Sequence, residues 1–128
     1  MPTHAEAAAL FERRRLAWLA GDLDGYLALW HPDVVFASPV HDPPICGREA
    51  YAAVVRRSYA ALRPLRFDVA RLAVAGAAVL AEWSILVERR ADARPVGWRG
   101  MSACEIEGGL IRDWREYWNP ADLAALRA

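Results

Sequence analysis

Hydrophobic and polar residues follow a helical period along the first part of the chain. The segment THAE (residues 3–6) has the form of a capping box, in which a threonine and a glutamate satisfy the first free N–H groups of a helix. Hydrophobic residues at spacings of three and four continue up to Gly21, a residue typical of helix ends. The pattern predicts a second short helix from Asp22 to near Trp30 and a third over residues 48–62.

The rest of the chain predicts β-strands. DVVFAS (33–38) is predicted as a strand, and a proline-rich loop, PVHDPPICG (39–47), follows it. Four long strand-like stretches come after residue 62, divided by the turns AGA, ADARP and EGG, and Asn119 with Pro120 begins a short terminal helix. Helices followed by a strand meander indicate an α+β fold, a curved antiparallel sheet with helices on one face. We expect residues 1–128 to form a single domain.

The last strand carries an unusual pattern, WREYW (114–118). Side chains alternate between the two faces of a strand, so Trp114, Glu116 and Trp118 share one face. A carboxylate between two tryptophans indicates that this face is either solvated or lines a cavity in which the glutamate has a task.

Charge and composition exclude several classes of protein. The 128 residues are 55% hydrophobic and carry 16 basic and 16 acidic side chains, a net charge of +0. This balance argues against a nucleic-acid-binding protein, and the absence of lysine excludes Schiff-base chemistry through a lysine. The longest apolar run is too short to span a bilayer, and no segment has the order of a signal peptide. We therefore expect a cytoplasmic protein without a membrane partner.

No motif for a metal or an organic cofactor is present. The two cysteines form no CxxC pair, and no histidines or acids have metal-site spacing. The glycine-rich nucleotide motifs and G-x-S-x-G are also absent. We expect neither a metal nor a cofactor.

Three segments, GDLDGYLALWHPDVVFASP (21–39), GREAY (47–51) and GGLIRDWREYWNP (108–120), resemble the NTF2-like superfamily. More narrowly, the chain is similar to the SnoaL-like, or polyketide cyclase-like, proteins, whose relatives include ketosteroid isomerases and limonene-epoxide hydrolases. The resemblance implies a cone-shaped fold, a curved antiparallel sheet wrapped around three helices with a deep apolar pocket, and a homodimer. The scaffold itself does not specify a function.

The relatives' catalytic groups are mostly replaced in this chain. By the resemblance, the isomerase base corresponds to Ser38, and the two oxyanion donors correspond to Arg14 and Ser102. Steroid isomerisation by the usual groups is therefore not expected. The final carboxylate of the hydrolases is retained, as Glu116, whereas the arginine and aspartate of their middle strand correspond to Trp83 and Ile85.

The resemblance and the strand alternation together predict a tryptophan-rich pocket. Glu116, Arg14 and His41 are the candidate catalytic residues. The candidate substrate-binding residues are Trp18, Phe36, Ser38, Trp83, Ile85, Trp98, Ser102, Cys104, Trp114 and Trp118. The tryptophans can equally form ordinary core. Glu116 can be a general acid or base with a raised pKa, a structural partner of Arg14, or an exposed strand residue.

Two classes of function remain open. The first is a SnoaL-like enzyme that acts on a small, largely apolar molecule by acid–base isomerase, cyclase or hydrolase chemistry. The second is a non-catalytic ligand-binding or dimerisation module. Leu80, Leu86, Met101 and Ala103 lie on the outward parity of the sheet, and this apolar surface predicts the face of a homodimer.

Overall fold

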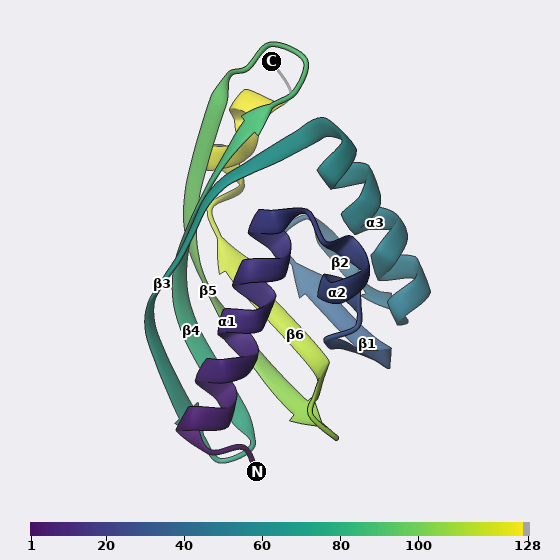
Figure 1. The fold of residues 1–128 in the computed structure, drawn as a ribbon, viewed down its shortest axis with the longest axis vertical. Helices are drawn as coiled ribbons and strands as arrows, with labels where there is room; N and C mark the ends of the chain where they lie inside the picture. Colours follow the sequence, from purple (N-terminus) through teal and green to yellow (C-terminus); the bar gives the residue numbers. More distant parts are fainter. Residues whose placement is uncertain (127–128) are drawn as a thin grey trace.

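The computed structural model describes residues 1–126 and shows three α-helices packed against one curved sheet (Figure 1). The helices are α1 (His4–Ala20), α2 (Leu23–Leu27) and α3 (Arg48–Ala61). The strands are β1 (Trp30–Ser38), β2 (His41–Cys46), β3 (Leu62–Ala75), β4 (Ala78–Arg89), β5 (Pro95–Glu107) and β6 (Leu110–Trp118), and a 3₁₀ helix, η1, covers Pro120–Leu126. The predicted α+β class, with a curved sheet around three helices, is confirmed.

The sheet has the strand order β2-β1-β6-β5-β4-β3. All neighbouring strands are antiparallel except β1 and β6, which run parallel, so the sheet is mixed rather than wholly antiparallel. This pair brings the N-terminal β-hairpin against the last strand, with Phe36 opposite Trp114. The parallel pair therefore joins the two distant segments that contain the predicted site residues.

The start of α1 forms as the sequence predicts. The Thr3 hydroxyl accepts a hydrogen bond from the Glu6 amide at 3.1 Å, and the Glu6 carboxylate accepts one from the Thr3 amide at 3.4 Å. The helix ends at Gly21, which has a φ of 71°. The Tyr59 hydroxyl lies 2.0 Å from the position that a Cβ of Gly21 would occupy, so this glycine also permits the close approach of α3.

Two predicted boundaries were wrong. The proline-rich segment 39–47, predicted as a loop, contains β2. Its prolines are compatible with a strand because β2 lies at the edge of the sheet, where missing N–H groups cost no ladder bonds on the free side. The second helix ends at Leu27 instead of near Trp30, and Trp30 is the first residue of β1.

Trp30 lies at the centre of an aromatic core. Its ring centroid is 4.5 Å from that of Tyr51 and 5.3 Å from that of Trp114, with Tyr26 and Phe36 at 5.9 and 6.0 Å. The core lies between the concave face of the sheet and the helices, with α1 against β3 and α3 against β1 (Figure 1). Within residues 1–126, no helix is both long and apolar enough to cross a membrane.

Candidate functional site

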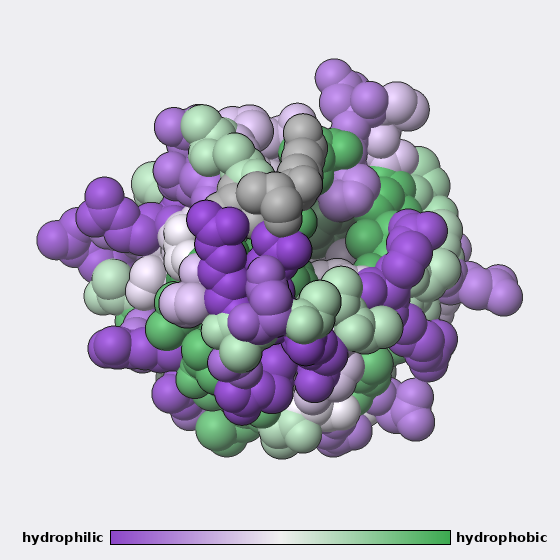
Figure 2. All heavy atoms as spheres, turned by 90° about the horizontal axis from the view of Figure 1, so that it is seen from above, coloured by the Kyte–Doolittle hydropathy of each residue, from purple (hydrophilic) through white to green (hydrophobic). Residues whose placement is uncertain are grey.

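A cavity of about 190 Å³ lies beside this core, between α1, α3 and the ends of β3, β4 and β5. Figure 2 looks onto the end of the molecule where these elements meet and shows hydrophobic residues among hydrophilic ones. Most of the lining is aromatic or aliphatic. The lining residues are Arg14, Trp18, Tyr26, Phe36, His41, Tyr51, Val54, Val55, Ser58, Tyr59, Leu62, Pro64, Phe67, Ile85, Val87 and Trp98.

Arg14 is the charged side chain of this cavity. It projects from α1 into the interior and is only 6% exposed. Its guanidinium carbon lies 4.5 Å from the ring centre of Trp114, 5.0 Å from that of Phe67 and 5.9 Å from that of Tyr26. Two of its nitrogens, Nε and Nη1, are buried and have no hydrogen-bond partner within the described chain. Cation–π contacts therefore take the place of ion pairs around this charge.

Two tyrosine hydroxyls lie beside Arg14. The hydroxyl oxygens of Tyr26 on α2 and Tyr51 on α3 are 2.8 Å apart, and both residues are buried. Burial raises the pKa of Tyr51 well above its ordinary value, and the neighbouring Tyr26 acts in the same direction. The Tyr51 phenol is therefore neutral at physiological pH. A pair of hydroxyls joined by one hydrogen bond has one O–H left to offer.

Glu116 is held by the two tryptophans that flank it in WREYW. Its carboxylate accepts a hydrogen bond from the Trp114 indole at 2.9 Å and from the Trp118 indole at 2.6 Å. Burial raises the pKa of Glu116, whereas the two indole donors and the charge of Arg14 oppose that rise. Arg14 lies over the ring of Trp114 and Glu116 accepts the N–H of the same indole, but no ion pair joins the guanidinium to the carboxylate within the described chain.

His41 and Ser38 come together where β1 turns into β2. The Ser38 hydroxyl lies 2.8 Å from Nδ1 of His41 and also accepts a hydrogen bond from the Val40 amide. Burial lowers the pKa of His41, and the positive charge of Arg57 acts in the same direction. The imidazole is therefore neutral at physiological pH, which suits a proton acceptor at the border of the cavity.

The family is established by comparison with known proteins. The sequence model of the SnoaL-like domain matches residues 8–114. The chain belongs to the SnoaL-like domain family. No match is found among curated protein sequences.

Solved structures of similar fold extend this result, and the fold is NTF2-like. A Mycobacterium tuberculosis LEH-like epoxide hydrolase is 26% identical, with a TM-score of 0.80, over 98% of this chain and 93% of the other. A proposed polyketide cyclase from Xanthomonas campestris is 20% identical, with a TM-score of 0.78, over 98% of both chains. A computationally designed 17-OHP binder is 24% identical, with a TM-score of 0.78, over 89% of this chain and 93% of the other.

The predicted site residues of this SnoaL-like domain fall into two groups. Six of them line the cavity: Arg14, Trp18, Phe36, His41, Ile85 and Trp98. The others are not among the lining residues and lie in the adjoining core or beside it: Ser38, Trp83, Ser102, Cys104, Trp114, Glu116 and Trp118.

The second group contains a set of buried contacts along β4 and β5. The Trp83 indole donates to the Ser102 hydroxyl at 3.2 Å, and both residues are buried. Burial raises the pKa of Cys104 to about 12, so its thiol stays protonated and unreactive at neutral pH. Trp83 also stacks on Phe67 of the cavity wall, with ring centroids 6.4 Å apart, and so supports that wall.

Helix α3 supplies lining residues that were absent from the predicted site. Tyr51, Val54, Val55 and Ser58 all face the cavity. A signal for them exists in the sequence, because they recur at helical spacing on one face of the predicted third helix. The comparison with catalytic positions of relatives gave no reason to include that face.

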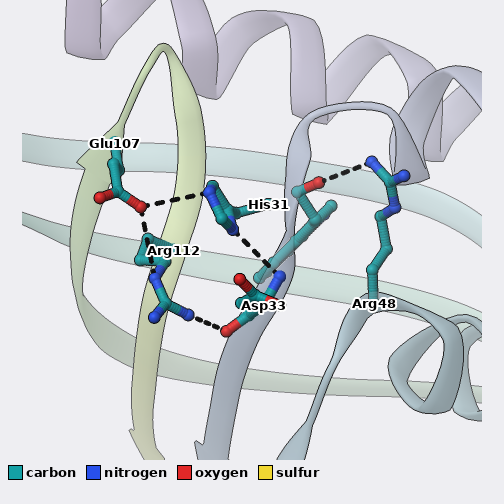
Figure 3. Close-up of polar contacts among 6 residues, drawn as sticks. His31, Asp33, Arg48, Glu107 and Arg112 are labelled. Carbon is teal, nitrogen blue, oxygen red and sulfur yellow. Dashed lines mark hydrogen bonds and ion pairs between the residues drawn. The ribbon is translucent and has the colours of Figure 1, made fainter.

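A second polar cluster lies at the opposite end of β1 and β6 (Figure 3). Glu107 contacts Nε2 of His31 at 3.2 Å and Nε of Arg112 at 3.4 Å. Arg112 also donates to the Asp33 carbonyl, and the Asp33 amide donates to Nδ1 of His31 at 3.0 Å. These contacts fasten the start of β1 to the β5–β6 turn. Within residues 1–126, no three histidine, cysteine or acidic side chains lie close enough together to hold a metal ion.

Proposed function

We propose that this SnoaL-like domain binds a small, largely apolar molecule in the cavity between α1, α3 and the sheet. The observation that carries the proposal is the cavity itself, about 190 Å³ lined by aromatic and aliphatic side chains, with a few polar groups at defined points. Apolar walls with a small number of placed polar groups are typical of small-molecule sites.

The size of the cavity limits the ligand. A protein cavity of about 150 Å³ holds benzene, so a volume of about 190 Å³ suits one six-membered ring with a short substituent. Structures of the same fold include a designed 17-OHP binder and an LEH-like epoxide hydrolase. These relatives support a ligand-binding role, while the volume here favours a smaller molecule.

The position of Glu116 favours binding over chemistry by this carboxylate. Both of its oxygens accept indole N–H groups, and Glu116 is not among the residues that line the cavity. We propose that Glu116 acts as a positioning residue, which fixes the Trp114 ring under Arg14. Neither Trp114 nor Trp118 then needs to touch the ligand.

A second candidate function is acid–base chemistry on the bound molecule, with His41 as the base. The observation that favours it is the contact at 2.8 Å between the Ser38 hydroxyl and Nδ1 of His41, which leaves Nε2 available on a residue that lines the cavity. In that case the turnover of a ligand would be lost in His41→Asn while its binding would remain.

Binding is tested with a cavity-filling variant. We expect single-ring compounds, among them toluene, benzamide and benzoate, to include at least one that quenches the fluorescence of Trp18 and Trp98 and raises the melting temperature. Val55→Phe should remove both effects by filling the cavity, while Leu16→Phe, at an exposed site on α1, should keep them. The proposal fails if no compound of the set changes either signal in the natural protein.

We also propose a homodimer through the outward face of the sheet. Met101 and Tyr117 lie opposite each other on β5 and β6 and are 51% and 60% exposed, and Leu80 on β4 is exposed beside them. Exposed apolar side chains on a sheet face suit an isologous interface. Sedimentation should give a dimer mass for the natural protein and a monomer mass for Met101→Glu; a monomer in both would contradict the proposal.

A further inference from the structure

We propose that the ligand of the cavity is a small carboxylate with a single ring, whose acid group accepts hydrogen bonds from Arg14. This inference rests on the proposed function, because it assumes that the cavity is a binding site, and it adds the chemical class of the ligand.

The charge and the free N–H groups of Arg14 indicate that the ligand is an anion. A guanidinium is charged at all physiological pH values and offers five N–H donors. Two of its nitrogens, Nε and Nη1, are buried without a partner, although the side chain lines the cavity. Buried donors without partners are rare in proteins because each one costs its full desolvation energy. An acceptor that is bound only part of the time is a physical reason for such an arrangement.

The surroundings of Arg14 leave its N–H edge unsatisfied. Trp114 and Phe67 contact the guanidinium through their rings, and Tyr26 acts on it through its ring and its hydroxyl. Ring faces interact with the charge but do not replace hydrogen-bond acceptors, so Nε and Nη1 still have none. The carboxylate of Glu116 already accepts two indole N–H groups. No ion pair with Arg14 is formed within the described chain.

The rest of the cavity lining also favours a negatively charged ligand. Among the described residues that line the cavity, none is an aspartate or a glutamate, and Arg14 is the one that carries a full charge. The Tyr26–Tyr51 pair adds one spare O–H donor near the guanidinium. A site that presents donors and a positive charge within an apolar wall is complementary to an anionic oxygen attached to an apolar ring.

A matched pair of probes separates charge from shape. Benzoate and benzamide have the same ring and nearly the same size, but only benzoate carries a negative charge at pH 7. We expect the natural protein to bind benzoate roughly tenfold or more tightly than benzamide, since hydrogen bonds to charged groups are worth more than neutral ones. Tryptophan fluorescence and melting temperature measure both affinities.

Two variants of neighbouring arginines complete the test. Arg14→Met removes the charge inside the cavity, whereas Arg13→Met removes the same charge from an exposed position on the same helix. The preference for benzoate should disappear in Arg14→Met and remain in Arg13→Met. If Arg14→Met does not fold, the preference of the natural protein for benzoate over benzamide still decides the question.

The outcomes distinguish the two proposals. Equal binding of benzoate and benzamide by the natural protein overturns the carboxylate inference and leaves the proposed ligand-binding function intact. Equal loss of benzoate binding in Arg13→Met and Arg14→Met also overturns the inference, because the effect would then be one of net charge. Failure of every probe, neutral or charged, overturns the proposed function and with it the inference.

Discussion

The interior cluster around Arg14 and the outer cluster around Arg112 both combine an arginine with a glutamate, but only the outer one joins them directly. Arg112 contacts Glu107 at 3.4 Å and donates to a backbone carbonyl, and these side chains are 38% and 64% exposed (Figure 3). In the interior cluster, Arg14 and Glu116 both contact Trp114 but form no ion pair with each other in the described chain, and two nitrogens of the guanidinium have no hydrogen-bond partner.

This difference separates charges that form ordinary surface ion pairs from a buried charge that the fold does not need for its stability. The outer pairs cross from β1 to β6 and to the β5–β6 turn, where water screens them, so each contributes little to stability. A buried charge loses several kcal/mol of hydration. The ring contacts return about 2 kcal/mol each, but they leave two buried nitrogens of Arg14 without acceptors, at a cost of about 1–3 kcal/mol for each group. The interior arrangement is therefore costly as a structural device and reasonable as a prepared binding site.

The largest effect should come from removing the carboxylate that supports the interior cluster. Glu116→Ala leaves the buried Trp114 indole without its acceptor and removes a negative charge that acts on Arg14. We expect the free energy of unfolding to fall by about 2–4 kcal/mol. The matched change in the outer cluster, Glu107→Ala, should cost about 0.5 kcal/mol or less. Urea unfolding measures both, and equal losses would remove the distinction between the two clusters.

A smaller effect is expected from removing one indole donor. Trp118→Phe keeps the ring but deletes the hydrogen bond at 2.6 Å to Glu116. The loss of a hydrogen bond to a charged acceptor should cost about 1.5–3 kcal/mol and raise the pKa of Glu116 further. Trp98→Phe is the control, because the described contacts of its indole include no hydrogen bond. Urea unfolding that gives the same value for both variants would contradict a holding role for Trp118.

The smallest effect concerns His41 and pH. Because burial and Arg57 lower its pKa in the folded protein, the unfolded chain binds a proton more readily than the folded one. Neutral His41 therefore makes its full contribution to stability above pH 6.5, the ordinary pKa of histidine. The free energy of unfolding should fall as the pH drops from 6.5 through the lowered pKa of the folded protein. His41→Asn should flatten that part of the pH profile. An unchanged profile in the variant would show that another group causes the fall.

The sequence predicts more of the fold than of the site. The capping box, the stop at Gly21 and the strand meander follow from local patterns, and they are observed. The strand β2 was missed because its prolines signal a loop, and only its place at the sheet edge makes them acceptable. The parallel pairing of β1 with β6 depends on the whole topology, so local patterns could not predict it.

Strand alternation alone could not distinguish the residues that line the cavity from those in the adjoining core. Strand alternation places Trp114, Glu116 and Trp118 on one face, but the ring of Trp114 fills the space that a ligand would need there. The unpartnered nitrogens of Arg14 and the hydroxyl pair of Tyr26 with Tyr51 depend on distances between three helices. Such distances are a property of packing, which a hydrophobic pattern does not specify.

The free energy of unfolding of Arg14→Met, measured without ligand, tests the central claim most directly. If Arg14 is present for a ligand, an apolar side chain of similar length should leave stability unchanged or raise it by about 1–2 kcal/mol. Glu116 can then take up a proton, as its raised pKa indicates. A fall of about 3 kcal/mol or more would show instead that the charge of Arg14 holds the aromatic core together, and would contradict the account.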